Sequence, residues 1–339
     1  MRIGIASQLL GTGLQRVLQN QPECEITWIA QNGLEAVQKC ETDIPDILLI
    51  DPNLPILDGA ETTRRIMKSS HSPILLVTDS VEGNAAKIFE AMGCGAVDAV
   101  DFAVNGSAEE REKSTQNLLK KIKTIMRLQQ FSVRESKPSA LVIDVKQANI
   151  PPLIVIGASA GGPKTLSAIL SKLSAPCASA IVIIQHVDRD FSFGLTEWLN
   201  NQTSLTVQVA RIHERPQAGH VYVAGTNDHL VLTASLRFAY TPEPRNMPYR
   251  PSVDVFFNSV AKYWPTPGQA IILTGMGRDG AEGLALLRQV GWHTIAQDEA
   301  TSVVYGMPKA AKEIGAAVEV LPLDQIIRSI QQSVTKNTR

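Results

Sequence analysis

The run Leu153-Ile-Val-Ile-Gly-Ala-Ser159-Ala-Gly-Gly162-Pro-Lys-Thr-Leu166 is apolar, stops at a turn of small residues and restarts with the composition of a helix. Consecutive apolar residues predict a buried strand, and Gly157, Gly161 and Gly162 allow the backbone to turn sharply. Ser159 is therefore expected at the tip of a strand-to-helix turn. Unpaired backbone N–H groups and the positive end of the helix dipole would stabilise an oxyanion there.

The string Gly157-Ala-Ser-Ala-Gly161 fits the G-x-S-x-G pattern of a nucleophile elbow. Small residues at such turns are also common for packing reasons alone. Two phosphate-binding patterns overlap the same residues, but the sequence matches neither of them. A Walker A loop requires lysine directly after its last glycine, and Pro163 intervenes before Lys164. A dinucleotide fingerprint requires glycine where Ser159 stands, so a nucleotide-binding protein is the weaker alternative.

The composition is that of an ordinary soluble protein, with 339 residues, 44% hydrophobic residues and a formal net charge of -1. This length predicts two domains, each able to bury a core. The balanced charge gives no general case for nucleic-acid binding. We expect no signal peptide and no membrane insertion, because the apolar runs are short. Four widely spaced cysteines suggest neither a zinc site nor disulfides and fit the cytoplasm: Cys24, Cys40, Cys94 and Cys177.

Short apolar runs alternate with amphipathic segments through the first 125 or so residues. The expected strands are Ile3–Ala6, Ile26–Ala30, Ile47–Asp51, Ile74–Thr78 and Ala96–Val100. This alternation predicts a doubly wound parallel sheet, with function at the carboxyl ends of the strands. A closing helix near Leu118–Leu128 carries a basic run that we interpret as a solvated face: Lys120, Lys121, Lys123 and Arg127.

The organisation predicted from these patterns is a first domain over residues 1–126, a helix end and linker over 127–150, and a second domain over 151–339. From residue 131 the periodicity is lost and Ser and Pro accumulate, with one short ordered segment expected at Leu141–Ile143. In the second domain, Val221–Ala224 and His229–Leu232 are expected to form a hairpin. Buried strands are expected at Leu153–Ile156, Ala180–Gln185 and Ala270–Gly275.

Two of these buried strands end on residues that a serine nucleophile needs. His186 follows one strand, and Asp279 lies in the Gly-rich loop after another. His186 would take the proton from Ser159 and return it to the leaving group, while Asp279 would orient the imidazole. A histidine after a strand is more often structural, but three such groups at one sheet edge favour catalysis.

Several long motifs in this half of the chain resemble the CheB family of chemotaxis protein-glutamate methylesterases. They are Ile156-Gly-Ala-Ser-Ala-Gly-Gly162, Gln185-His-Val187, Arg250-Pro-Ser-Val-Asp-Val-Phe-Phe257, Leu273-Thr-Gly-Met-Gly-Arg-Asp-Gly-Ala281 and Ala296-Gln-Asp-Glu-Ala-Thr-Ser-Val-Val-Tyr-Gly-Met-Pro308. The resemblance covers most of residues 153–325. It implies α/β architecture with two doubly wound domains, a flavodoxin-like receiver and a Rossmann-like methylesterase domain.

The resemblance implies that Ser159, His186 and Asp279 form a catalytic triad. This triad hydrolyses glutamyl methyl esters on methyl-accepting chemoreceptors and in some members deamidates receptor glutamines. Ala160 is expected to give an oxyanion N–H, with Gly161 and Met276 lining the site. The esterase chemistry requires no metal or cofactor. A non-catalytic adaptor of a chemosensory array is the alternative, and a monomer is expected.

Other histidines and charged residues are weaker candidates for the active site. An α/β-hydrolase would place its histidine last, at His293, which we disfavour. Packing or surface roles are expected for His213, His220 and His229. Arg250 and Asp254 fit either the active-site face or structural salt bridges.

The first domain resembles a response-regulator receiver in which Asp51 would accept phosphate and Thr78 would supply the accompanying hydroxyl. Receivers hold Mg²⁺ with an acidic pair after the first strand, but this chain has Ala6-Ser7 there. They also use a lysine after the fifth strand, where this chain has Asp101-Phe102. We therefore expect a degenerate receiver that a CheA-type histidine kinase phosphorylates poorly or not at all.

Overall fold

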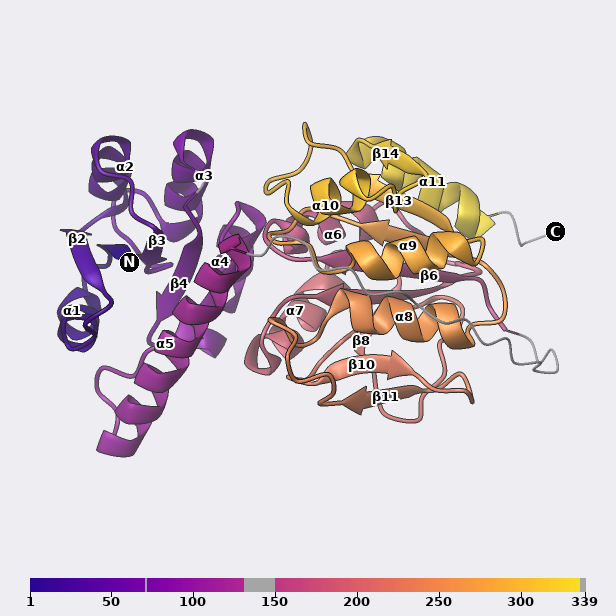
Figure 1. The fold of residues 1–339 in the computed structure, drawn as a ribbon, viewed down its shortest axis with the longest axis horizontal. Coiled ribbons are helices and arrows are strands. Elements are labelled where there is room, and N and C mark those ends of the chain that lie inside the picture. The colour runs from indigo at the N-terminus through magenta and orange to yellow at the C-terminus, as the bar shows by residue number, and fades with distance from the viewer. Residues whose placement is uncertain (71, 131–149, 336–339) are drawn as a thin grey trace. The chain divides into compact units, whose positions relative to one another are not determined.

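The computed structural model of the protein describes residues 1–70, 72–130 and 150–335. Contacts divide the chain into two units, Met1–Phe131 and Ser132–Arg339, each built around its own parallel sheet (Figure 1). The predicted ordered segment Leu141–Ile143, like most of the predicted linker, lies outside the described residues.

The first unit has strands and helices in strict alternation, as the sequence predicts. These are β1 (Arg2–Ala6), α1 (Gly11–Gln19), β2 (Glu25–Ala30), α2 (Gly33–Thr42), β3 (Ile47–Ile50), α3 (Gly59–Ser69), β4 (Ile74–Thr78), α4 (Val81–Gly93), β5 (Asp98–Asp101) and α5 (Ala108–Gln130). The strand order β2-β1-β3-β4-β5 is that of flavodoxin-like sheets. Every residue of β3 is buried, as in a strand with helices over both faces.

The basic face predicted for the closing helix is only partly solvated. Lys123 is exposed, but the Lys121 side chain is only 13% exposed. Its Nζ lies 2.8 Å from Asp98 Oδ2 and 2.7 Å from the Ala99 carbonyl oxygen. The interpretation was wrong for Lys121, because the apolar stripe of α5 brings this residue against the end of the sheet, where it needs a partner.

The second unit contains a seven-stranded parallel sheet and a separate two-stranded ribbon. Its elements are β6 (Leu153–Ala158), α6 (Gly162–Leu170), β7 (Ala180–Gln185), α7 (Arg189–Asn200), β8 (Thr206–Val209), β9 (His220–Val223), β10 (His229–Leu232), β11 (Phe238–Thr241), α8 (Val253–Tyr263), β12 (Gln269–Ile272), α9 (Ala281–Gln289), β13 (His293–Gln297), α10 (Met307–Glu313), β14 (Glu319–Leu321) and α11 (Leu323–Thr335). The order β14-β13-β12-β6-β7-β9-β8 confirms the predicted doubly wound sheet.

The direction of the chain crossovers reverses at the centre of this sheet, between β6 and β12. From β6 the chain crosses through α6 to β7 on one side, whereas from β12 it crosses through α9 to β13 on the other. Gly157 on β6 pairs with Ile272 on β12 and with Ile184 on β7. The carboxyl ends of three adjacent strands therefore meet at a topological switch point, where ligands bind in such sheets.

The predicted hairpin between Val221–Ala224 and His229–Leu232 is wrong. β9 pairs in parallel with β7 and β8, and β10 instead pairs antiparallel with β11. Residues of β9 are buried on both faces, which requires a place inside the main sheet. The ribbon lies beside α8 (Figure 1), where Leu232 N donates to Ser259 Oγ at 2.9 Å.

Aromatic side chains fill the core between the main sheet, α8 and the ribbon. The Tyr222 and Phe238 rings lie 5.1 Å apart, and Phe256 and Phe257 of α8 are fully buried. This packing fixes the position of α8, whose first residues, Val253 and Asp254, donate backbone hydrogen bonds to Asp279. Among the described helices, none combines the length and the apolar character needed to cross a bilayer.

Candidate active site

Ser159 stands at the tip of the turn between β6 and α6. Its N–H donates to the Thr274 carbonyl oxygen at 3.1 Å, and its own carbonyl oxygen accepts from Gly162 N at 2.8 Å. Gly161 caps the helix with φ of +80°, and a Cβ there would lie 2.7 Å from Val303 Cβ. The turn therefore requires glycine. The Ser159 side chain is buried, and its Oγ makes no hydrogen bond to any described residue.

His186 follows β7 at the same edge of the sheet. Its N–H donates to the Ala158 carbonyl oxygen at 3.0 Å, and its Nε2 lies 2.7 Å from Asp279 Oδ2. The residue is 2% exposed, and Nδ1 has no hydrogen-bond partner within the described residues. The Tyr249 ring stacks on the imidazole, with centroids 4.2 Å apart and planes 21° apart.

The Asp279 carboxylate is held at the N-terminus of α8. Oδ1 accepts from Ser252 Oγ at 2.8 Å and Asp254 N at 3.1 Å, and Oδ2 accepts from Val253 N at 2.7 Å. Burial alone would raise the pKa of Asp279. The hydrogen bonds from His186, Val253 and Ser252 outweigh it and lower the pKa to about 2. The carboxylate is therefore ionised at neutral pH.

This pairing assigns different tasks to the two imidazole nitrogens of His186. Nε2 faces an ionised carboxylate, which only accepts hydrogen bonds, so Nε2 carries the proton. In the neutral ring Nδ1 is then the basic nitrogen.

Gln185 links the turn that carries Ser159 to His186. Its Nε2 donates to the carbonyl oxygens of Ser159 and His186 at 2.9 and 3.2 Å.

Two backbone N–H groups, one following Ser159 and one following Gly275, have no acceptor among the described residues. Within the described part of the chain, neither Ala160 N nor Met276 N donates a hydrogen bond, whereas Ser159 N is used by Thr274. Gly275 brings the Met276 segment against the nucleophile, since a Cβ on Gly275 would lie 2.8 Å from Ser159 Cβ. Such N–H pairs stabilise the oxyanion of acyl-transfer reactions.

Four residues of this site were not assigned a role from the sequence: Gln185, Thr274, Tyr249 and Ser252. Thr274 Oγ1 donates to the Ala160 carbonyl oxygen at 2.8 Å and accepts from Val304 N at 2.9 Å. Gln185 and Thr274 share the sequence pattern that identified His186, because each is a polar residue at the end of a buried strand. Tyr249 offered no such signal, because its contact with His186 joins distant segments.

The other histidines among the described residues lie outside this arrangement. His293 begins β13, at the edge of the sheet opposite Ser159, and its Nε2 lies 2.7 Å from Glu319 Oε2. His213 is exposed, and His220 is half-buried with Nδ1 3.1 Å from the Ala218 carbonyl oxygen.

His229 is a buried structural residue. Its Nδ1 accepts from Ser252 N at 3.1 Å, and its Nε2 lies 3.2 Å from the Pro244 carbonyl oxygen. Burial lowers the pKa of His229, so the ring is neutral and Nε2 donates to Pro244. His229 therefore supports the segment that binds Asp279.

Of the two roles expected for Asp254, the salt bridge is absent among the described residues, and its N–H instead donates to Asp279 at 3.1 Å. Its carboxyl accepts from Gly283 N at 2.7 Å. Burial first, and then the charge of Asp279, raise the pKa of Asp254 well above its usual range. Asp254 lies in the first turn of α8 beside Asp279 and α9, and no cation of the described residues forms an ion pair with it there.

In the first unit, Asp51 follows β3 and is buried with both carboxylate oxygens bonded. Oδ2 accepts from Ser7 Oγ at 2.9 Å and Oδ1 accepts from Asn53 N at 2.8 Å. Burial raises the pKa of Asp51, although these two hydrogen bonds act in the opposite direction. Thr78 Oγ1 accepts from Asn84 Nδ2 at 2.9 Å.

The residues around Asp51 do not fit the Mg²⁺ ion that receivers use. Where the acidic pair would stand, Ala6 has no ligand atom and the Ser7 hydroxyl donates to Asp51. In the described ranges no three His, Cys, Asp or Glu residues are grouped to hold a metal ion. The residue that follows β5 is the buried Phe102 and offers no cation to a phosphoryl group.

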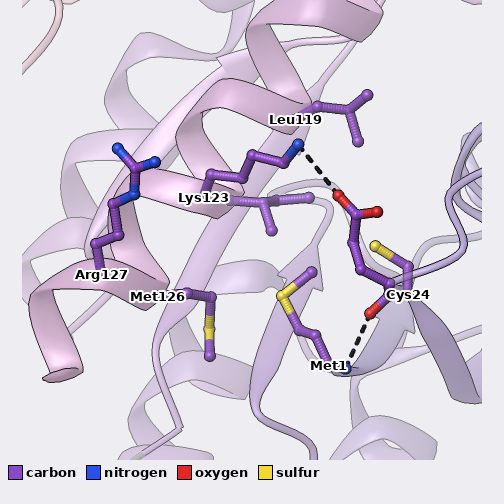
Figure 2. Close-up of a pocket in the computed structure, with 8 residues that line it drawn as sticks. Met1, Cys24, Leu119, Lys123, Met126 and Arg127 are labelled. Atoms are coloured by element: carbon purple, nitrogen blue, oxygen red, sulfur yellow. Dashed lines mark hydrogen bonds and ion pairs between the residues drawn. The ribbon is translucent and has the colours of Figure 1, made fainter.

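A cavity of about 270 Å³ lies in the first unit at the other edge of its sheet. Figure 2 shows the residues that line it, which are Met1, Glu23, Cys24, Leu119, Ile122, Lys123, Met126 and Arg127. Lys123 Nζ lies 3.1 Å from Glu23 Oε1 beside its mouth. These residues come from the amino ends of β1 and β2 and from α5, so the cavity is remote from Asp51.

Comparisons with known proteins agree with this geometry. Residues 154–330 match the family model described as CheB methylesterase, and residues 7–104 match that of the response regulator receiver domain. A protein-glutamate methylesterase/protein-glutamine glutaminase 2 of Cupriavidus metallidurans is 48% identical over 328 residues, covering 96% of each chain. One from Mesorhizobium japonicum is 46% identical over 343 residues, covering 100% of each chain.

A solved structure supports the same assignment for the second unit. The Thermotoga maritima CheB methylesterase catalytic domain is 35% identical with a TM-score of 0.51, covering 53% of this chain and 97% of that one. Two parallel-sheet units, family models matching each of them and relatives similar over the full length lead to one assignment. The chain belongs to the CheB methylesterase family, with a response regulator receiver domain ahead of its methylesterase domain.

Proposed function

We propose that this chain hydrolyses glutamate methyl esters on methyl-accepting chemoreceptors, with Ser159 as nucleophile, in bacterial chemosensory adaptation. The relatives named protein-glutamate methylesterase/protein-glutamine glutaminase support both this activity and a second one, deamidation of receptor glutamines. The observation that carries the proposal is the buried contact of 2.7 Å between His186 Nε2 and Asp279 Oδ2, one strand away from Ser159. A cytoplasmic location fits the four free cysteines.

The reaction follows from the roles of the atoms. Ser159 Oγ attacks the ester carbonyl carbon while His186 Nδ1 takes its proton, and Asp279 stabilises the imidazolium that results. The N–H groups of Ala160 and Met276 stabilise the tetrahedral oxyanion. When the intermediate collapses, the carbon–oxygen bond to the methoxy group breaks and His186 gives its proton to the leaving oxygen, which forms methanol.

The second half of the reaction regenerates the enzyme. Water adds to the glutamyl–Ser159 ester as His186 removes one of its protons, and the proton then returns to Ser159 Oγ. The products are the receptor glutamate and methanol. With a glutamine substrate, the same steps release ammonia in place of methanol.

Methanol release from a methylated chemoreceptor tests this function. Ser159→Ala should lower turnover at least about a thousandfold, as loss of a nucleophile does in serine hydrolases. The matched control is Ser171→Ala at the exposed end of α6, which should leave turnover unchanged. Absence of methanol with the unaltered protein would favour the non-catalytic adaptor.

We further propose that the receiver acts without phosphorylation. The Ser7 hydroxyl occupies Asp51 Oδ2, and Lys87 Nζ donates to Asn53 Oδ1 at 2.7 Å rather than to a phosphoryl group. Asn84 bonds both Asn53 and Thr78, so the hydroxyl expected to accompany phosphate already has a partner. A CheA-type kinase, the partner implied by the family, would then not transfer phosphate to Asp51.

Acetyl phosphate with Mg²⁺, followed by intact-mass measurement and methanol release, tests the state of the receiver. We expect no phosphoryl adduct and equal turnover with and without the donor. Ser7→Asp restores one carboxylate and serves as the comparison for Mg²⁺ binding. A Mg²⁺-dependent adduct that disappears in Asp51→Asn and accompanies faster methanol release would overturn the proposal.

A further inference from the structure

One face of the His186 imidazole is covered by the ring of Tyr249. The two planes are 21° from parallel and their centroids lie 4.2 Å apart, a close stacked geometry. Tyr249 comes from the segment between β11 and α8, and Ser252 at the end of this segment donates to Asp279. The same short segment therefore contacts both the histidine and the aspartate.

The hydrogen bond to Asp279 does not by itself fix the orientation of the ring. One contact at Nε2 leaves the imidazole free to tilt about that atom, and Nδ1 would move with it. Nδ1 has no hydrogen-bond partner within the described residues that could hold it. A ring stacked on the face of the imidazole removes this freedom without competing for Nδ1.

The stack also distinguishes the charged ring from the neutral one. An aromatic face attracts a cation, and the imidazole of His186 becomes a cation only while it holds the proton of Ser159. An interaction that strengthens in the transition state raises kcat, whereas one that is equal in both states does not.

We propose that Tyr249 is a positioning residue for His186, whose ring sets the imidazole plane so that Nδ1 faces Ser159 and stabilises the imidazolium formed during turnover. The inference rests on the proposed esterase function and adds a residue outside the triad. The aromatic ring, and not the hydroxyl, performs this role.

Steady-state methanol release with Tyr249→Leu and Tyr249→Phe tests the inference. The leucine variant should lose about tenfold in kcat with KM nearly unchanged, and phenylalanine should restore most of it. The matched control is Tyr263→Leu at the far end of α8, which should not change kcat. Equal kcat in the leucine variant and the unaltered protein would overturn the inference.

Proton NMR of His186 separates this inference from the function on which it rests. Stacking shifts the imidazole carbon-bound protons upfield, so their signals should move downfield in Tyr249→Leu and stay in place in Tyr249→Phe. His186→Asn assigns the signals. Unchanged shifts in the leucine variant would refute the stack, whereas a normal shift pattern without any methanol release would refute only the esterase function. If the leucine variant does not fold, Tyr249→Met replaces it in both measurements.

Discussion

The pKa values of two neighbouring carboxyl groups at the start of α8 are shifted in opposite directions. Asp279 accepts several hydrogen bonds and has a pKa of about 2, whereas burial raises that of Asp254. Two like charges this close destabilise each other, so the carboxyl with fewer hydrogen-bond donors has the raised pKa. The stability that Asp279 contributes is present above its unfolded pKa, near 4, and is lost as the pH falls toward 2.

Asp254 has the opposite effect on stability. Its raised pKa means that its contribution is greatest below about pH 4 and is lost as the pH rises toward the native value. Asp254→Asn keeps an acceptor for Gly283 N but carries no charge. At pH 7 this variant should melt about 2–4 °C above the unaltered protein, and the difference should shrink at pH 4.

Thermal unfolding at the two pH values measures this effect of Asp254→Asn. Asp324→Asn is the control, because Asp324 is 63% exposed. This variant should show the same small difference in melting temperature at pH 4 and at pH 7. A melting difference for Asp254→Asn that does not change between pH 4 and pH 7 would contradict the raised pKa of Asp254.

At the residue scale, sequence patterns locate groups that end buried strands. Ser159, His186 and Asp279 were chosen for that reason, and the structure brings His186 and Asp279 into contact. Their role as a triad stays a prediction until methanol release is measured. The raised pKa of Asp254 was not predictable, since it depends on burial and on a charge 25 residues away in sequence that packing brings beside it.

Among the elements, α8 contributes most directly to the chemistry. Its N-terminal N–H groups and its capping residue Ser252 bind the carboxylate of Asp279, as helix N-termini bind anions. Ser252 Oγ also accepts from Val255 N at 3.3 Å and so caps the helix. One hydroxyl therefore stabilises both the helix and the ionised aspartate.

Ser252→Ala should lower both the melting temperature and kcat. Loss of the cap costs about 1 kcal/mol, and loss of the hydrogen bond to Asp279 should reduce kcat by about three- to tenfold. The matched control is Ser80→Ala, which removes the equivalent cap of α4, where Ser80 Oγ accepts from Gly83 N. It should reduce stability alone. Similar kcat values in the two variants would show that Ser252 does not act through Asp279.

The wrong prediction of a hairpin between β9 and β10 also concerns single elements. Both segments are short and apolar, and only a few residues separate them, which is the pattern of a hairpin. Pairing was decided by the rest of the molecule, because β9 fills a place between β7 and β8 and leaves β10 to pair with β11. Local periodicity identifies strands but does not choose their partners.

For the whole molecule, the chain divides into units that each have a sheet of their own. The similar Thermotoga maritima catalytic domain was solved as a separate domain, which supports independent folding of the second unit. A chain of residues 150–339 should therefore unfold cooperatively and release methanol at least as fast as the full protein. Circular dichroism and turnover measure this. Slower turnover in the isolated unit would mean that the receiver activates the esterase.

The exposed stretch from Pro242 to Asn246 divides the catalytic groups along the chain, with Ser159 and His186 before it and Asp279 after it. Cleavage there yields two fragments, neither of which holds a complete set of reacting groups. Pairing of β6 with β12 would keep them together without a covalent link. The molecule is thus a natural candidate for enzyme complementation, in which two inactive pieces recover ester hydrolysis only when they reassemble.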